Sequence, residues 1–324
     1  MTKLERIIIT KKPIAFLLNK SKHWYLPGFE GVPLYDVVRF FYRQIKTSSI
    51  TERASAIAYN FIMAIPPSFL FLFTLIPNLP FIKKREIMRQ LSLVIKDIIP
   101  AEGYNKTFVT FIDKTFFQAP VFGLLSFGLL LALYFASNAM MGLMRSFNKN
   151  YHGFERRMGL HTRWVAIRLT VLIFGLVLGC LVILITQGAV LKFLGLESPF
   201  WLAVILYLRW LVIIALVFYS IAFIYKYAPA VQKKWKLVSP GTILATFLCI
   251  IASLGFSSFV NTFGRYNVLY GSIGAIIVLM ALIYINSLVL LIGFELNVSI
   301  KTLKSRAIKR DAKEKIELAE QKNT

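Results

Sequence analysis

Residues 54–81 read ASAIAYNFIMAIPPSFLFLFTLIPNLPF, an almost wholly apolar stretch that contains Pro66, Pro67, Pro77 and Pro80. About 20 apolar residues cross the hydrocarbon core of a bilayer, so the stretch is long enough to be a transmembrane helix. Because proline has no backbone N–H, Pro66 and Pro67 near its middle predict a break in that helix. Two interpretations stay open: a kinked helix that packs in a bundle, or a helix that lines a substrate path.

The composition of the whole chain agrees with membrane insertion. Of its 324 residues, 57% are hydrophobic and the mean hydropathy is +0.66, against an apolar content of roughly 45 to 50% in soluble domains. We therefore predict an all-α, polytopic membrane protein. No long apolar segment in residues 1–49 precedes a small-residue cleavage site, so the first span is expected to direct insertion without a cleaved signal peptide. Cys180 and Cys249 lie in apolar stretches and predict core residues rather than a disulfide framework.

Five further apolar stretches exceed 20 residues and carry few charges, which predicts six transmembrane helices in all. They cover residues 121–144, 164–190, 200–225, 241–262 and 272–296. In the third span, Gly175 and Gly179 form a GxxxG step, a spacing that lets another helix approach closely. We assign residues 50–297 to one membrane domain, residues 1–49 to a basic N-terminal segment and residues 298–324 to a basic tail.

The distribution of basic residues predicts the orientation of these spans. With six spans, one side of the membrane receives 27 Lys and Arg residues from the N-terminal segment, two loops and the tail, and the other side receives nine. The positive-inside rule therefore places both termini in the cytoplasm. Cytoplasmic loops then account for the net charge of +23, and we expect no nucleic-acid partner.

Two segments outside the spans are amphipathic. Between residues 34 and 46, apolar side chains recur at helical spacing and basic side chains take the opposite face. We predict an interfacial helix on the lipid surface, with docking on a cytosolic domain as the alternative. Residues 83–119 carry two apolar stripes separated by Pro100 and Gly103, which predicts an outer amphipathic hairpin that serves either as packing or as a lid.

Charged residues inside spans cost at least about 2.5 to 3.5 kcal/mol at a helix centre and therefore mark interior surfaces. Arg209 lies nine residues into the fourth span, too deep for its side chain to reach the headgroups easily. Arg168 lies about one turn into the third span, and Glu295 closes the sixth span on the predicted cytoplasmic side. We predict that Glu295 forms a structural ion pair with Arg53 or with Arg168.

Amide side chains lie at comparable depth in other spans. Together with Arg209 they predict one polar cavity beside the two central prolines, where the guanidinium would bind an anionic group. The expected substrate-binding residues are Arg209, Asn60, Pro66, Pro67, Asn138 and Asn286. The alternative for each asparagine is a hydrogen bond between helices, and for Arg209 it is a bond to backbone carbonyls that joins two spans.

The sequence carries no pattern for catalysis, a metal or a cofactor. The three histidines are His23, His152 and His161, and none lies in HxHxD or HExxH spacing. A GxxxxGK(S/T) phosphate loop, a GxSxG elbow and a GxGxxG turn are also missing from the sequence. We therefore expect no catalytic residue, no bound metal, no cofactor and no enzyme activity.

Several motifs resemble the BrkB (YihY-type, "virulence factor") family of bacterial inner-membrane proteins. In the last third of the chain these are Tyr225, Pro229, Trp235, Pro240-Gly241, Phe256, Tyr266-Asn267, Tyr270-Gly271-Ser272 and Gly293-Phe294-Glu295-Leu296-Asn297. Earlier matches are Ala54, Ala56, Ala58 and Pro67 in the first span and residues 148–151 after the second. The resemblance covers roughly residues 51–297 and implies six transmembrane helices with cytoplasmic termini. It implies little chemistry, since members have carried a ribonuclease label and have also been proposed as lipid or solute transporters.

We expect a multi-pass protein of the bacterial inner membrane that transports or flips an anionic or amphiphilic substrate, such as a lipid, an envelope precursor or a small solute. Membrane lipids are the expected partners, together with envelope proteins. The alternative is a non-transporting scaffold that anchors envelope machinery through the outer hairpin or the tails. The ribonuclease label finds no support in the spacing of the histidines.

Overall fold

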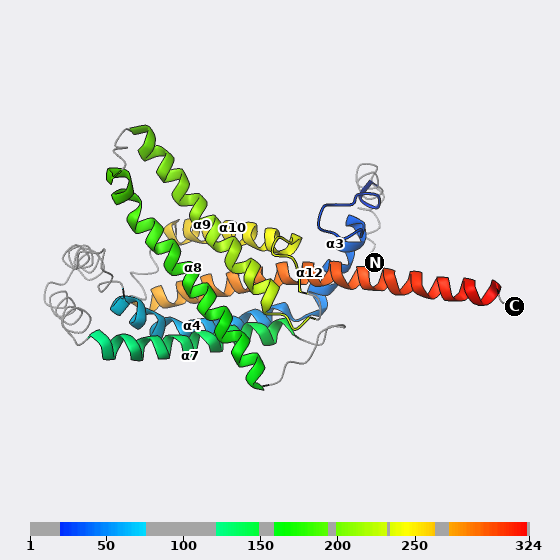
Figure 1. Ribbon diagram of the computed structural model, residues 1–324, viewed down its shortest axis with the longest axis horizontal. Helices are drawn as coiled ribbons and strands as arrows, with labels where there is room; N and C mark the ends of the chain where they lie inside the picture. Colours follow the sequence, from blue (N-terminus) through cyan, green and yellow to red (C-terminus); the bar gives the residue numbers. More distant parts are fainter. Residues whose placement is uncertain are drawn as a thin grey trace. The chain divides into compact units, whose positions relative to one another are not determined.

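The computed structural model describes residues 20–75, 121–148, 159–193, 199–231, 234–262 and 272–322 (Figure 1). Its helices are α3 (Leu34–Thr47), α4 (Ile50–Leu75), α7 (Val121–Phe147), α8 (Gly159–Phe193), α9 (Pro199–Tyr227), α10 (Pro240–Thr262) and α12 (Ser272–Lys322). The predicted all-α fold is thereby confirmed for the described part of the chain. The predicted hairpin at residues 83–119 lies outside the described residues.

The described part of each of the six predicted spans falls on one of these helices; residues 76–81 of the first span lie outside the described residues. Four stretches of the described residues are long and apolar enough to cross a membrane: Ser126–Phe147, Gly159–Cys180, Trp210–Tyr227 and Ile277–Glu314. A shorter apolar stretch, Pro240–Phe256, lies in α10. By length and composition the structure therefore supports several membrane spans, and the number six stays a prediction.

Local sequence signals explain where two of the helices begin. The first residues of α9 and α10 are Pro199 and Pro240, and proline suits the first helical position because its missing N–H would have no partner within the helix there. Before α10, Ser239 Oγ accepts a hydrogen bond from the backbone N–H of Thr242 at 3.2 Å. Ser239 therefore caps the helix N-terminus.

Helix α4 corrects the prediction of a broken first span. The helix continues without interruption through Pro66 and Pro67. Each proline removes only one backbone hydrogen bond, and a membrane helix tolerates this where nearby groups satisfy the freed carbonyls. Just after the pair, Ser68 Oγ donates a hydrogen bond of 2.7 Å to the carbonyl of Ala64, which adds a donor to this turn. The two prolines therefore lie inside a continuous helix.

The chain divides into two compact units, which are described separately. The first unit comprises residues 1–58, 144–157 and 173–324, and the second comprises residues 59–143 and 158–172. In the first unit, α12 has 51 residues, which at 1.5 Å per residue corresponds to about 77 Å. A hydrocarbon core is only about 30 Å thick. Most of the predicted basic tail is therefore a continuation of α12, the helix that carries the sixth predicted span.

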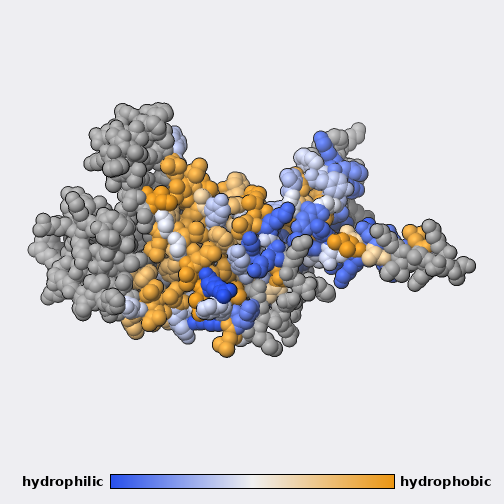
Figure 2. All heavy atoms as spheres, viewed as in Figure 1, coloured by the Kyte–Doolittle hydropathy of each residue, from blue (hydrophilic) through white to orange (hydrophobic). Residues whose placement is uncertain are grey.

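The N-terminal segment of the first unit packs on α12. A small apolar core joins them, made of Phe29, Val32, Val37 and Ile300 with Leu34, Leu296 and Leu303 at its edge. Outside this core, hydrophilic side chains gather around α3, as Figure 2 shows. One face of α3 is therefore docked on α12 of the same chain. The predicted contact with the lipid surface, and its alternative of docking on a cytosolic domain, stay predictions.

Candidate functional site

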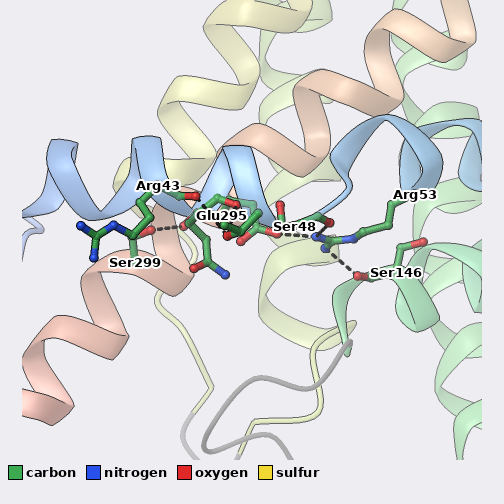
Figure 3. A network of polar contacts seen from close by, with 8 residues as sticks. Arg43, Ser48, Arg53, Ser146, Glu295 and Ser299 are labelled. Atoms are coloured by element: carbon green, nitrogen blue, oxygen red, sulfur yellow. Dashed lines mark hydrogen bonds and ion pairs between the residues drawn. The ribbon is translucent and has the colours of Figure 1, made fainter. Parts of the chain in front are cut away.

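A buried ion pair lies in the first unit, where α4 begins beside α12. Arg53 Nη1 donates to Glu295 Oε1 at 2.5 Å, and the two side chains are 6% and 0% exposed. The same guanidinium donates through Nη2 to the carbonyl of Ser146 at 2.6 Å and through Nη1 to that of Ser48 at 3.4 Å (Figure 3). Arg53 thus joins the start of α4 to α12 and to the end of α7.

Aromatic rings pack next to this ion pair, around Phe294. The ring of Phe147 stacks on Phe294 with centroids 4.0 Å apart, and the ring of Tyr225 meets Phe294 edge-on at 6.2 Å. The ring centroid of Trp235 lies 5.4 Å from that of Phe294. Tyr225 also donates its hydroxyl hydrogen to the carbonyl of Leu290 at 2.6 Å. These buried rings hold the ends of α7 and α9 against the middle of α12.

Helices α10 and α12 come into backbone contact at two glycines. A Cβ added to Gly241 would lie 2.1 Å from the carbonyl oxygen of Gly293, and a Cβ added to Gly293 would lie 2.6 Å from that of Gly241. At Gly175 and Gly179, in contrast, an added Cβ meets no atom of the described structure within 4 Å. The helix contact predicted at the GxxxG step is therefore absent within the described chain, and glycines serve close packing at Gly241 and Gly293 instead.

Two asparagines complete the polar contacts of this region. Asn297 Oδ1 accepts the backbone N–H of Gly241 at 2.9 Å, and its Nδ2 donates to Ser239 Oγ at 2.9 Å. Asn148 Oδ1 accepts the N–H of Ala230 at 2.8 Å. These bonds satisfy backbone donors at the start of α10 and after α9. The region built by Arg53, the aromatic rings, the glycines and the asparagines is a structural core.

In the second unit, the guanidinium of Arg163 lies between two apolar helices, α7 and α8. Arg163 of α8 donates through Nη1 to Asn138 Oδ1 of α7, and its guanidinium carbon lies 4.8 Å from the centre of the Tyr134 ring. Met141 Sδ lies 3.9 Å from the same Nη1. Arg163 and Asn138 are both half-buried, and no carboxylate pairs with Arg163 among the residues that the structure describes.

Asn60 of α4 packs against α7 at Gly142, one helical turn beyond Asn138. A Cβ added to Gly142 would lie 2.7 Å from Asn60 Nδ2, so the side chain of Asn60 occupies the space that the glycine leaves. Positions 138 and 142 lie on one face of a helix because four residues make about one turn. The second unit therefore brings two of the predicted binding residues, Asn60 and Asn138, to the same face of α7.

Two other predicted binding residues, Asn286 and Arg209, lie in the first unit. Asn286 Nδ2 donates to the carbonyl of Leu282 in its own helix at 3.0 Å and approaches Ser253 Oγ of α10 at 3.5 Å, as expected for a contact between helices. Arg209 lies in α9, and its side chain is outside the described residues. Arg209 and Asn286 belong to the first unit and the remaining candidates to the second, so one shared cavity stays a prediction.

Of the two partners predicted for Glu295, the structure pairs it with Arg53. Arg168 belongs to the second unit, where its guanidinium lies over the ring of Trp164 at 5.1 Å. Sequence reasoning missed Arg163 because it counted this residue among the basic charges of the preceding loop. The signal that was available is its position just before Trp164, where an apolar run begins.

Metal-ligating side chains do not gather within the part of the chain that the structure describes. No group of three His, Cys, Asp or Glu residues there lies close enough to hold an ion. His152 lies outside the described residues.

Comparisons with known proteins relate the chain to proteins of several bacteria, some of them named as membrane proteins. The protein YfkH of Bacillus subtilis (strain 168), named as ribonuclease-like, is 31% identical over 250 residues, which cover 76% of this chain and 88% of YfkH. A UPF0761 membrane protein of Tolumonas auensis is 24% identical over 300 residues, which cover 89% of this chain and 92% of the relative. A UPF0761 membrane protein of Chromohalobacter salexigens is 26% identical over 252 residues, covering 76% of this chain and 58% of the relative.

No solved structure matches the chain. The family described as Virulence factor BrkB matches residues 41–317, a range that contains all the helices from α4 to α10 and most of α12. It also includes every motif on which the resemblance was based. The chain is therefore a membrane protein that belongs to the Virulence factor BrkB family.

Proposed function

We propose that this protein transports or flips an anionic or amphiphilic substrate across the bacterial inner membrane, with both termini in the cytoplasm. The proposed substrate is a lipid, an envelope precursor or a small solute that carries a phosphate or a carboxylate. The observation that carries the proposal is Arg163, whose described contacts are an amide, a thioether and an aromatic ring. A guanidinium without a carboxylate partner in an apolar helix favours binding of an anion.

The position of this cation supports the proposal. Arg163 is the fifth residue of α8 and directly precedes the predicted third span, so its guanidinium lies at the end of that span. There it offers a planar set of donors that matches phosphate or carboxylate oxygens. Asn60 of α4, which packs on α7 one helical turn from Asn138, is suited to bind the polar, uncharged part of the same molecule.

Arg209 is the second candidate for an anion-binding residue. It lies in the middle of an apolar helix, where a charge is costly unless it serves an internal polar surface. Arg209 is a separate proposal from Arg163, because the two residues belong to different units of the chain.

Two other functions compete with transport. A ribonuclease activity is suggested only by the name of the relative YfkH, and this chain has no histidine spacing typical of a metal-dependent nuclease. We therefore propose that it is not an enzyme. A scaffold is favoured by the C-terminal part of α12, which continues to Lys322 with exposed side chains at residues 305–314.

Lipid translocation in vesicles tests the proposal. Purified protein is reconstituted with fluorescent phosphatidylglycerol, and the fraction of the probe that moves between leaflets is followed by chemical quenching. Arg163→Gln keeps a polar side chain but removes the charge, and Arg168→Gln is its matched control, since Arg168 is exposed in the same helix and lies over Trp164. Hydrogen bonds to a charged group contribute about 1.5 to 3 kcal/mol, so Arg163→Gln should slow translocation about tenfold or more.

The control variant should move the probe at the wild-type rate. Vesicles loaded with inorganic phosphate form a second arm, which separates a small anion from a lipid as the substrate. A wild-type protein that moves neither probe would contradict the transport proposal and favour the scaffold. Equal rates for the wild type and Arg163→Gln would contradict the role of Arg163.

A further inference from the structure

A second surface of the protein lies on α3, apart from the residues proposed for transport. Helix α3 has two faces, and only one of them packs on α12. Val37 is fully buried against the core that includes Ile300 and Leu303. At 100° per residue, Tyr35 and Tyr42 lie about 140 to 160° around the helix from Val37. These tyrosines and Val38 therefore form a second stripe that faces away from α12.

This second face combines apolar and basic side chains. Val38 and Tyr42 are 52% and 58% exposed, so this face presents apolar surface outside the protein. Arg39, Arg43 and Lys46 flank them and are exposed as well. Lys46 Nζ lies 4.5 Å from the centre of the Tyr42 ring, so the charge and the ring are presented together. Aromatic rings with adjacent basic groups are typical of the membrane–water interface.

The attachment of α3 to α12 keeps this face near the end of the predicted sixth span. The contact residues Ile300 and Leu303 lie four and seven residues beyond Leu296, where the predicted span ends. This corresponds to about 6 to 10 Å along the helix. The headgroup layer occupies roughly the first 5 to 8 Å outside the hydrocarbon core. Helix α3 is therefore held within reach of the lipid headgroups.

Ion pairs and a ring contact keep the N-terminal segment in this position. Glu30 Oε1 accepts from Lys301 Nζ at 2.5 Å, and Glu30 Oε2 lies 3.0 Å from Lys304 Nζ. The guanidinium of Arg306 lies over the ring of Phe40 at 5.1 Å. With one face fixed to α12 by these contacts, α3 cannot turn its basic face inward without breaking them.

We infer that the face of α3 formed by Tyr35, Val38, Arg39, Tyr42, Arg43 and Lys46 binds anionic phospholipid headgroups of the leaflet next to it. The charge complementarity is direct, since the face carries three basic residues and the helix has a single acid, Asp36. Each Lys or Arg near an anionic surface adds about 1 kcal/mol of attraction. The tyrosines and Val38 add contacts at the boundary between headgroups and acyl chains.

Spin labelling of the full chain in lipid nanodiscs tests this inference. A nitroxide is attached at Val38→Cys, with Cys180 and Cys249 replaced by alanine, and its exposure to oxygen and to a water-soluble nickel complex reports its depth. In phosphatidylglycerol nanodiscs the label should lie at the interface, and in phosphatidylcholine nanodiscs it should be more exposed to nickel. A label at Ile308→Cys, which is exposed on the charged part of α12, should remain in water in both.

Charge removal provides the second comparison. The triple variant Arg39→Gln, Arg43→Gln and Lys46→Gln should lower the ratio of interface to water populations by up to about 100-fold. Its matched control removes three exposed charges of α12 instead, Lys309, Arg310 and Lys313, and should change nothing at position 38. If the triple variant fails to fold, the two lipid compositions compared on the wild-type charges still test the inference.

Three outcomes would overturn it. A label at position 38 that stays fully exposed to nickel in phosphatidylglycerol means that the face does not touch lipid. A label with equal depth in both lipids means that lipid charge is not recognised. A label shielded from both oxygen and nickel means that protein, such as a second copy of the chain, covers the face.

Discussion

The contact between α10 and α12 gives the sharpest test of how the first unit is held together. Replacing Gly293 by alanine places a Cβ 2.6 Å from Ala245 Cβ, 2.6 Å from the carbonyl oxygen of Gly241 and 2.6 Å from the hydroxyl of Tyr225. Ordinary contacts between such atoms are about 3.5 to 4.0 Å. The neighbours must therefore move by about 1 Å, and one of them is the backbone of the facing helix, which cannot rotate away.

The cost of this displacement can be estimated from other overpacked cores. Inserting a methyl group into a closely packed interior destabilises proteins by about 1 to 3 kcal/mol. The intrinsic helix propensity acts in the opposite direction, since alanine is favoured over glycine by about 0.5 to 1 kcal/mol in a helix. We expect steric overlap to dominate, because three atoms from three different residues are involved, and Gly293→Ala to lower the free energy of unfolding by about 1 to 2 kcal/mol.

The matched control is Gly255→Ala in α10, where an added Cβ meets nothing within 4 Å of the described structure. This variant should be as stable as the wild type, or more stable by up to about 1 kcal/mol. Unfolding of both variants by denaturing detergent, followed by tryptophan fluorescence, measures the difference; Trp235 lies next to Phe294 and should report on the region. If Gly293→Ala unfolds at the same detergent concentration as Gly255→Ala, the argument from backbone contact is wrong.

Two further predictions concern the charged contacts of the first unit. Glu295→Gln should destabilise the protein by about 3 to 5 kcal/mol, because it leaves the buried guanidinium of Arg53 without its counter-charge. Replacing both residues by methionine should cost less stability. The same detergent unfolding assay measures both variants, and an equal loss of stability in the two would argue against a tight ion pair. Burial opposes the ionisation of Glu30, but hydrogen bonds and the charges of Lys301 and Lys304 lower its pKa below the ordinary value of 4.5. The ionised Glu30 should therefore stabilise the docking of residues 20–33 on α12 fully above pH 4.5, and this stabilisation should be lost as the pH falls through the lowered pKa. Hydrogen exchange of residues 20–33 measures the effect. Glu30→Gln should remove this pH dependence, and a pH dependence that persists in the variant would point to another group.

The sequence allowed the positions of the helices to be predicted because long apolar runs with proline or polar boundaries are strong local signals. It also narrowed the partner of Glu295 to two arginines, and the structure pairs it with Arg53. The prediction of a break at Pro66 and Pro67 was wrong, because the loss of two backbone hydrogen bonds is not enough to end the helix there. The length of α12 was missed because its charged second half has no apolar periodicity.

Contacts between segments far apart in the sequence could not be predicted from local sequence patterns. Gly241 and Gly293 are 52 positions apart, and only the packed structure brings their backbones together. The GxxxG step at Gly175 and Gly179 gave the stronger sequence signal, but no described atom fills the space beside it. A small-residue spacing predicts that a close approach is possible, whereas the partner that uses it is decided by the rest of the fold.

The motif residues of the family explain why membership predicts the fold better than the substrate. Tyr225, Trp235, Gly241, Phe294 and Asn297 are all in the first unit, and each of them packs or bonds around α12. Their chemistry is that of a core: rings in contact, backbone groups satisfied, helices close together. We therefore expect proteins that share these residues to share the helical framework.

The residues proposed to meet an anion are of a different kind. Arg163 and Asn138 lie in the second unit, and neither belongs to the motifs that carry the resemblance. Substituting either one removes a polar contact between α7 and α8 without touching the aromatic core. A protein with the same framework can therefore carry other groups on α7 and α8, and under the transport proposal we expect substrate preference to follow positions 138 and 163 rather than the motifs around α12.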